Sequence, residues 1–156
     1  MRGIAAGAIA GGGATLLMGA VMLAARRLGL TPTLPPDKIA ESAVEAIAGR
    51  SPSEAEQRVV ATVAHLGFGA VAGAIFGGAV SPFRQLPAAA LAAIGSIYAI
   101  GIWLVSYQGW VPMLRIMPPA SRDHGGRVAT MGVSHVVYGS ALGLMTHALR
   151  GAFSQR

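Results

Sequence analysis

The stretch VVATVAHLGFGAVAGAIFGGAV, residues 59–80, indicates what kind of fold this chain adopts. It contains no Asp, Glu, Lys or Arg, and it matches the roughly 20 apolar residues that a helix needs to cross a bilayer. Three more stretches share these properties, at about residues 3–25, 86–105 and 128–149. The sequence therefore predicts an all-α, polytopic membrane protein with four transmembrane helices, in a single transmembrane domain over residues 1–156.

The composition of the chain supports a membrane environment. Of its 156 residues, 53% are apolar and only 12% are charged, whereas soluble domains carry about a quarter charged residues. Its 22 glycines would weaken helices in water, but small residues in a bilayer let helices approach closely. The lack of cysteine excludes disulfides and thiolate metal sites. Because the Arg residues are scattered at the span ends, no nucleic-acid partner is expected despite the net charge of +6.

The connections between the predicted spans differ in length. A tight turn at residues 81–85 joins the second and third spans. The first connection is long, and its residues 37–48 place apolar side chains on one helical face, which predicts a short amphipathic helix at the membrane interface. The sequence SPSE at residues 51–54 is typical of a capping box with proline at the first helical position, so the second long helix is expected to begin near Pro52.

The third connection, residues 106–127, contains three prolines and is expected to form an interfacial or re-entrant segment. Trp103, Tyr107 and Trp110 near its start predict an aromatic belt at the membrane surface. An even number of spans places both termini on one side. Eight Lys or Arg residues lie on the side of the long connections and four on the side of the termini, which favours long connections in the cytoplasm and termini in the periplasm.

The second and fourth spans share a motif, His-x-x-aromatic-Gly-x-x-x-Gly, which begins at His65 in one and at His135 in the other. An Arg precedes each motif by seven or eight residues, and a proline-containing connection precedes each span. These correspondences predict an internal repeat of two helical hairpins, residues 1–81 and 86–150, related as parallel repeats.

Glycines four residues apart lie on one face of a helix, and stripes of small residues are typical helix contact faces in membranes. Three of the spans carry such a stripe. The glycines expected to pack against neighbouring helices are Gly7 and Gly11 in the first span, Gly69, Gly73 and Gly77 in the second, and Gly139 and Gly143 in the fourth.

These motifs, together with WLVSYQGWVP at residues 103–112 and MPPA at residues 117–120, resemble a family of small bacterial inner-membrane proteins of unknown function, the YagU-like group. The resemblance covers nearly the whole chain. It implies four helices and a multi-pass location in the bacterial plasma membrane, and it implies no activity.

His65 and His135 are the candidate functional residues, because both are expected at membrane depth with their rings inside the bundle. In one interpretation each imidazole forms a structural hydrogen bond to a neighbouring helix. The candidate partners are Thr15, Ser96, Tyr98, Ser134 or a backbone carbonyl. In a second interpretation they bind haem b as axial ligands, with Gly69 and Gly139 leaving room for the ring. In a third they serve a small-solute carrier, since intramembrane ionisable groups mark transport paths.

The spans contain no carboxylate, so they offer neither paired acids nor a Ser-His-acid set for hydrolysis. No enzymatic activity and no resident metal are expected. The sequence instead predicts a structural or accessory component that contacts the lipid bilayer and packs with itself, as a homo-oligomer, or with a larger membrane complex. The alternative is a membrane protein that binds haem or carries a small solute through His65 and His135.

Overall fold

The computed structural model describes residues 1–154, and it is all-α over that range. Its four long helices are α1 (Arg2–Arg27), α3 (Glu54–Ala79), α4 (Ala88–Val105) and α6 (Gly125–Ser154). All four are long and apolar enough to cross a membrane, the third of them when α4 is taken on to Met113. The predictions of an all-α fold and of four candidate transmembrane helices are therefore confirmed.

The other elements are short and lie in the two long connections. The helix α2 (Pro35–Ala48) begins with two prolines, whose missing amide hydrogens cost nothing in a first turn, and ends at Gly49 in the left-handed conformation. After α4 come the π-helix η1 (Ser106–Trp110), the single turn α5 (Val111–Met113) and the 3-10 turn η2 (Ala120–Arg122).

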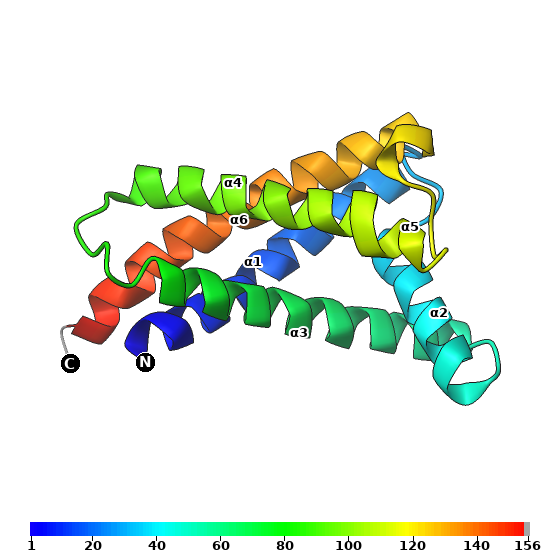
Figure 1. Cartoon of the computed structure of the whole chain (residues 1–156), viewed down its shortest axis with the longest axis horizontal. Helices are drawn as coiled ribbons and strands as arrows, with labels where there is room; N and C mark the ends of the chain where they lie inside the picture. The colour runs from blue at the N-terminus through cyan, green and yellow to red at the C-terminus, as the bar shows by residue number, and fades with distance from the viewer. Residues whose placement is uncertain (155–156) are drawn as a thin grey trace.

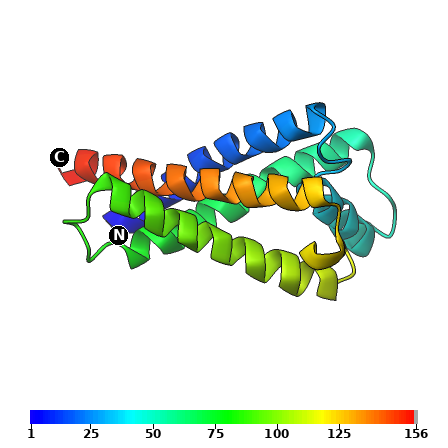
Figure 2. The same ribbon diagram turned by 90° about the horizontal axis from the view of Figure 1, so that it is seen from above.

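The long helices form a bundle in which α1 packs along both α3 and α6, and α4 packs along α6. Figure 1 shows α3 and α4 on the near side with α1 and α6 behind them. Both termini and the turn between α3 and α4 lie at one end of the bundle, whereas α2 lies at the opposite end; Figure 2 shows the same division from above. Figure 2 shows that α3 and α4 cross in that view near the middle of the bundle and lie well apart at the end where α2 lies.

Two predicted boundaries differ from the structure. The helix α3 begins at Glu54, and its cap is Ser53, whose Oγ accepts a hydrogen bond from the Glu56 amide at 3.2 Å. The capping residue is thus Ser53 rather than Ser51, because its side chain reaches the free amide of the first turn. After Val105 the chain continues in helical turns to Met113, interrupted by a kink at Gly109, instead of entering an interfacial loop at once.

Glycines allow α1 and α3 to approach closely along their length. A Cβ at Gly7 would overlap the Gly73 carbonyl oxygen and lie 2.8 Å from the Gly77 Cα, and a Cβ at Gly73 would lie 2.7 Å from the Gly11 Cα. Real carbon atoms pack at about 3.5–4.0 Å. The backbones of these two helices are therefore in direct contact, as small-residue stripes permit.

The contact between α4 and α6 is built in the same way. A Cβ at Gly139 would lie 2.5 Å from the Ser96 Cα, and a Cβ at Gly143 would lie 2.7 Å from the Ala92 Cα. Beside this contact the hydroxyls of Ser96 and Ser140 lie 2.8 Å apart and share a hydrogen bond. The α1–α3 pair and the α4–α6 pair thus each have a glycine-lined interface.

Two tyrosines connect the pairs across the bundle. The Tyr138 hydroxyl on α6 donates to the Gly69 carbonyl at 2.9 Å, and the Tyr98 hydroxyl on α4 donates to the Ala72 carbonyl at 3.0 Å. The Tyr98 ring also packs on Phe76, with centroids 5.6 Å apart. Both bonds reach α3 near its middle, on one side of the region where α3 and α4 diverge.

Candidate functional site

A cavity of about 240 Å³ lies beyond these tyrosine contacts, in the half of the bundle that faces α2. Its walls come from α1, α2, α3 and α6 and from the segment that runs from α4 into α5. Most of the lining side chains are apolar, and among the described residues that line it none is Asp, Glu, Lys or Arg. The cavity is therefore an apolar chamber with a few polar groups.

His65 and His135 both line this cavity, so the structure brings the two candidate residues to one site. His65 is carried by α3 one turn before Gly69, and His135 by α6 one turn before Gly139. Gly69 packs closely against α1 and Gly139 against α4. Each histidine lies on the same helix face as its glycine, one turn beyond the close contact between the helices. Its ring therefore lies where the neighbouring helices are further apart.

The hydrogen bonds of the two imidazoles differ from those expected. The His135 Nδ1 lies 2.8 Å from the Met131 carbonyl, one turn earlier in its own helix, rather than bonding a neighbouring helix. Within residues 1–154 no group bonds the His65 ring.

The hydroxyls that were expected to serve as partners are mostly engaged elsewhere. Thr15 donates to the Gly11 carbonyl at 2.8 Å, Ser96 pairs with Ser140, and Tyr98 donates to α3. Ser134 is fully buried, and its hydroxyl has no partner among the described residues. A purely structural hydrogen bond between helices is therefore not what holds either histidine.

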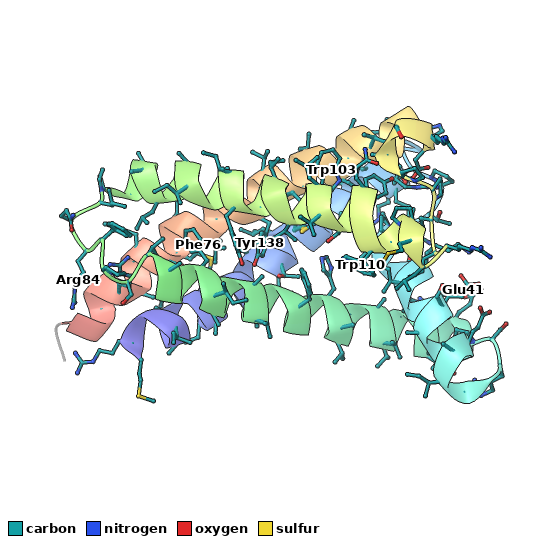
Figure 3. All side chains as sticks on the ribbon, in the orientation of Figure 1. Glu41, Phe76, Arg84, Trp103, Trp110 and Tyr138 are labelled. Atoms are coloured by element: carbon teal, nitrogen blue, oxygen red, sulfur yellow. The ribbon has the colours of Figure 1, made fainter. Side chains whose placement is uncertain are left out.

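The aromatic residues of the 103–110 segment also line the cavity. Figure 3 shows Trp110 and Tyr138 between the ribbons of α3 and α4. Tyr107 is only 4% exposed, and its ring lies 6.0 Å from that of Trp103. The Trp103 indole nitrogen is buried without a hydrogen-bond partner in the described part of the chain. The aromatic belt at the membrane surface stays a prediction, but these three side chains are components of the cavity wall.

A kink at Gly109 interrupts the helix that carries these aromatic side chains, because its φ of −106° and ψ of −105° are not helical. Ser106 and Tyr107 before the kink and Trp110 after it all line the cavity. This kink was not predicted from the sequence.

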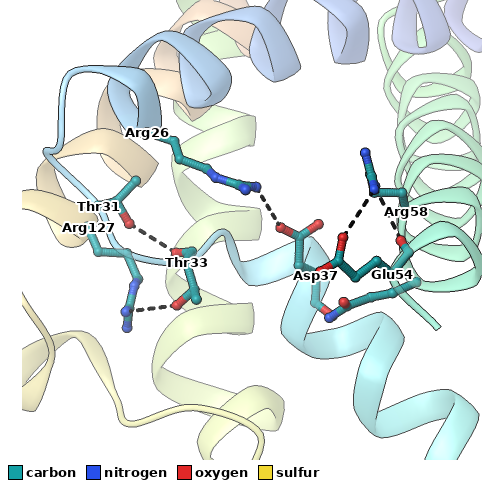
Figure 4. A network of polar contacts seen from close by, with 8 residues as sticks. Arg26, Thr31, Thr33, Asp37, Glu54, Arg58 and Arg127 are labelled. Carbon is teal, nitrogen blue, oxygen red and sulfur yellow. Dashed lines mark hydrogen bonds and ion pairs between the residues drawn. The ribbon is translucent and has the colours of Figure 1, made fainter. Parts of the chain in front are cut away.

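A polar cluster closes the cavity end of the bundle, and it was not predicted. The Tyr107 hydroxyl donates to the Asp123 carboxylate, which also pairs with Arg127 at 2.5 Å. Arg127 donates in turn to the Thr33 hydroxyl at 3.2 Å, which links α6 to the first connection (Figure 4). The side chains of Asp123 and Arg127 are 4% and 11% exposed.

The environment of Asp123 favours its charged form. Burial by itself raises the pKa of this carboxyl, but the hydrogen bonds from Tyr107, Arg127 and the His124 amide together outweigh burial. The pKa of Asp123 is therefore lowered from its usual value. The Asp123–Arg127 pair follows the local i,i+4 spacing and could have been considered from the sequence. Tyr107, however, lies 16 positions from Asp123, and Thr33 lies 94 positions from Arg127, so no local spacing indicates their part in the cluster.

A comparison with known families matches residues 1–155 to DUF6789, a family of unknown function. The chain belongs to this family. No curated protein and no solved structure matches it. The prediction of a family of unknown function is confirmed, whereas the YagU-like assignment stays a prediction.

The cavity of this DUF6789 member is small for a haem. Pockets that hold drug-sized ligands measure about 300–1,000 Å³, and haem belongs at the large end of that range, whereas this cavity measures about 240 Å³. Haem would fit only if α3 and α4 moved further apart. Among the described residues no three His, Cys, Asp or Glu side chains cluster as metal ligands. His147, outside the cavity, is exposed.

Proposed function

We propose that this DUF6789 protein is a multi-pass protein of the bacterial inner membrane that holds a small lipophilic molecule in the cavity between α3 and α4. It acts as a non-enzymatic accessory component, which associates either with copies of itself, as a homo-oligomer, or with a larger membrane complex. The observation that carries this proposal is the apolar cavity that contains both His65 and His135.

The outer surface of the bundle supports a membrane location. Large apolar side chains are exposed on every long helix, and examples are Leu16 at 64%, Val63 at 65%, Ile97 at 74% and Val133 at 56%. Soluble monomers rarely expose such continuous apolar surface. In a bilayer these side chains contact lipid tails at no cost, so the same surface supports a lipid bilayer as the surrounding medium.

The position of the cavity supports entry of a ligand from the bilayer. The helices α3 and α4 are not among the closely packed pairs, and the cavity lies between them where they diverge. Phe68 lines the cavity and is also 53% exposed, so it forms part of the rim. A lipophilic molecule would pass this rim from the lipid phase without crossing water.

The polar groups of the site support binding rather than catalysis. Within residues 1–154 no Asp or Glu lines the cavity, so neither histidine has the carboxylate that orients and charges the imidazole in a Ser-His-acid set. A haem or small-solute role for His65 and His135 is the alternative. The volume of about 240 Å³ argues against haem, and the absence of an intramembrane carboxylate among the lining residues argues against proton-coupled transport.

The helix pairs also support the proposed duplication of residues 1–81 and 86–150, since α1 pairs with α3 and α4 pairs with α6 through glycines. With α2 and the third connection at one end, the Lys and Arg distribution favours that end in the cytoplasm.

The two tryptophans of the chain, Trp103 and Trp110, both line the cavity, so their fluorescence reports on its contents. We expect a bromine-bearing alkyl chain to quench this fluorescence saturably in the detergent-purified protein. Ala64 on α3 lines the cavity and is exposed, so Ala64→Phe places a ring at the cavity mouth and narrows it. The adjacent Val63 is 65% exposed on the lipid side, so Val63→Phe is the matched control.

Saturable quenching in the wild type and in Val63→Phe, reduced at least about fivefold in affinity by Ala64→Phe, would support the proposed ligand site. Linear quenching of equal extent in all three proteins would contradict it, because the bromine would then reach the tryptophans only from the surrounding detergent. Light-scattering mass measurement of the same samples tests self-association separately: a single-chain mass would exclude the homo-oligomer.

A further inference from the structure

Two imidazoles line the cavity, those of His65 and His135, and each has a ring nitrogen that no described protein group bonds. From them we infer that the lipophilic ligand is a neutral molecule with a hydroxyl at its polar end, and that this hydroxyl donates a hydrogen bond to the His135 Nε2. This inference rests on the proposed function, since it names the class of ligand for the same cavity.

The first step concerns the protonation of His135. Its Nδ1 lies 2.8 Å from the Met131 carbonyl, and a carbonyl oxygen only accepts hydrogen bonds. The proton of the neutral ring is therefore on Nδ1, and the Nε2 carries a lone pair. A neighbouring carbonyl fixes the tautomer of ligand-binding histidines in the same way. His135 thus offers an acceptor, which calls for a donor on the ligand.

The second step concerns His65, whose ring also lines the cavity. Its imidazole has no hydrogen-bond partner among residues 1–154, so it is able either to donate or to accept. A hydroxyl can donate to His135 and accept from His65, so it matches both rings, whereas an ether or a ketone only accepts.

The third step concerns charge. No Asp or Glu among the lining residues stands ready to neutralise a cationic headgroup, and no Lys or Arg to bind a phosphate or carboxylate. Charges are expensive at membrane depth without such partners. The same lack of a carboxylate leaves the imidazoles without a counter-ion, which favours their neutral forms. The polar end of the ligand is therefore uncharged.

Two kinds of membrane molecule share this chemistry, the hydroquinones with a lipophilic chain and the glycerides with a free hydroxyl. In both, the cavity of about 240 Å³ would take the hydroxyl end, while the chains extend past the exposed Phe68 into the lipid. The test titrates decyl-hydroquinone and dioctanoylglycerol separately into the detergent-purified protein and follows Trp103 and Trp110 fluorescence. The dimethyl ether of decyl-hydroquinone and the O-methyl ether of dioctanoylglycerol are the hydroxyl-free counterparts. Each titration is repeated with His135→Leu and with His147→Leu, a control at an exposed histidine outside the cavity.

We expect the wild type and His147→Leu to bind at least one hydroxyl ligand about tenfold more tightly than its ether, which corresponds to one hydrogen bond. In His135→Leu that preference should disappear while the ether still binds as before. The arm in which the preference appears identifies the hydroquinone or the glyceride as the source.

Two results would overturn the inference, and they differ in what they say of the cavity. If both ethers bind as tightly as the hydroxyl ligands, the cavity binds lipophilic molecules but the hydroxyl is not recognised. If His135→Leu weakens ether and hydroxyl ligands equally, His135 supports the cavity only by packing. Absence of saturable binding by all four molecules would instead contradict the proposed function itself.

Discussion

The close approach of α1 and α3 makes a sharp prediction for Gly73→Ala, which adds one methyl group. In the wild-type backbone this Cβ would lie 2.7 Å from the Gly11 Cα and 2.9 Å from the Gly11 nitrogen. Carbon atoms pack at about 3.5–4.0 Å, so the helices must separate by about 1 Å at this point.

The size of the effect follows from that separation. A gap of about 0.5–1 Å forfeits a quarter to a half of each van der Waals contact, and the pairs of Gly7 with Gly77 and Gly11 with Gly69 lie on the same stripe. Overpacking of this kind costs about 1–3 kcal/mol. The better helix propensity of Ala returns at most about 1 kcal/mol. We therefore expect Gly73→Ala to lower the free energy of unfolding by about 1–2 kcal/mol.

The assay is reversible unfolding in mixed micelles with increasing SDS, followed by circular dichroism. Gly67→Ala is the matched control, because nothing lies within 4 Å of a Cβ at Gly67 on the same helix. Gly67→Ala should be neutral or slightly stabilising. Equal stability of Gly73→Ala and Gly67→Ala would refute the close backbone contact between α1 and α3.

Three further predictions concern the polar contacts and the orientation. Tyr98→Phe removes the hydroxyl bonded to the Ala72 carbonyl and should cost about 0.6–2 kcal/mol in the same unfolding assay; no change would show that this bond adds nothing. Asp123→Asn leaves Arg127 without its counter-charge, so it should cost up to about 3 kcal/mol at neutral pH. Because the pKa of Asp123 is lowered, its contribution is present above the ordinary value of 3.8 and is lost as the pH falls through the lowered pKa. The difference between wild type and Asp123→Asn in thermal melting should shrink below pH 3.8, and a constant difference would contradict this role. A reporter active only in the periplasm should be silent when fused at Ser51 and active at the C-terminus, and the reverse pattern would overturn the orientation.

The helices were predictable because apolar length alone defines a span. Residues 59–80 lack any charged side chain, and α3 contains all of them except Val80, which is its C-cap. The glycine spacing of four likewise marks one helix face from the sequence alone. The His135 bond to Met131 follows the same spacing, so a local carbonyl one turn earlier could have been considered as its partner.

The cavity was not predictable, because it results from where helices fail to pack. His65 and His135 were identified by their motif, but nothing in the sequence shows that α3 and α4 lie apart at the end of the bundle where α2 lies (Figure 2). The kink at Gly109, within Ser106–Trp110, likewise has no counterpart in the apolar pattern of the sequence.

The measurement that tests the central claim most directly is native mass spectrometry of the protein extracted together with its surrounding lipids. The wild type and Val63→Phe should retain one small neutral molecule per chain after the loosely bound lipids are removed. Ala64→Phe, which narrows the mouth of the cavity, should lose that molecule while it keeps the same helix content. A wild-type chain that retains nothing, or an Ala64→Phe chain that retains the same molecule to the same extent, would contradict a ligand site between α3 and α4.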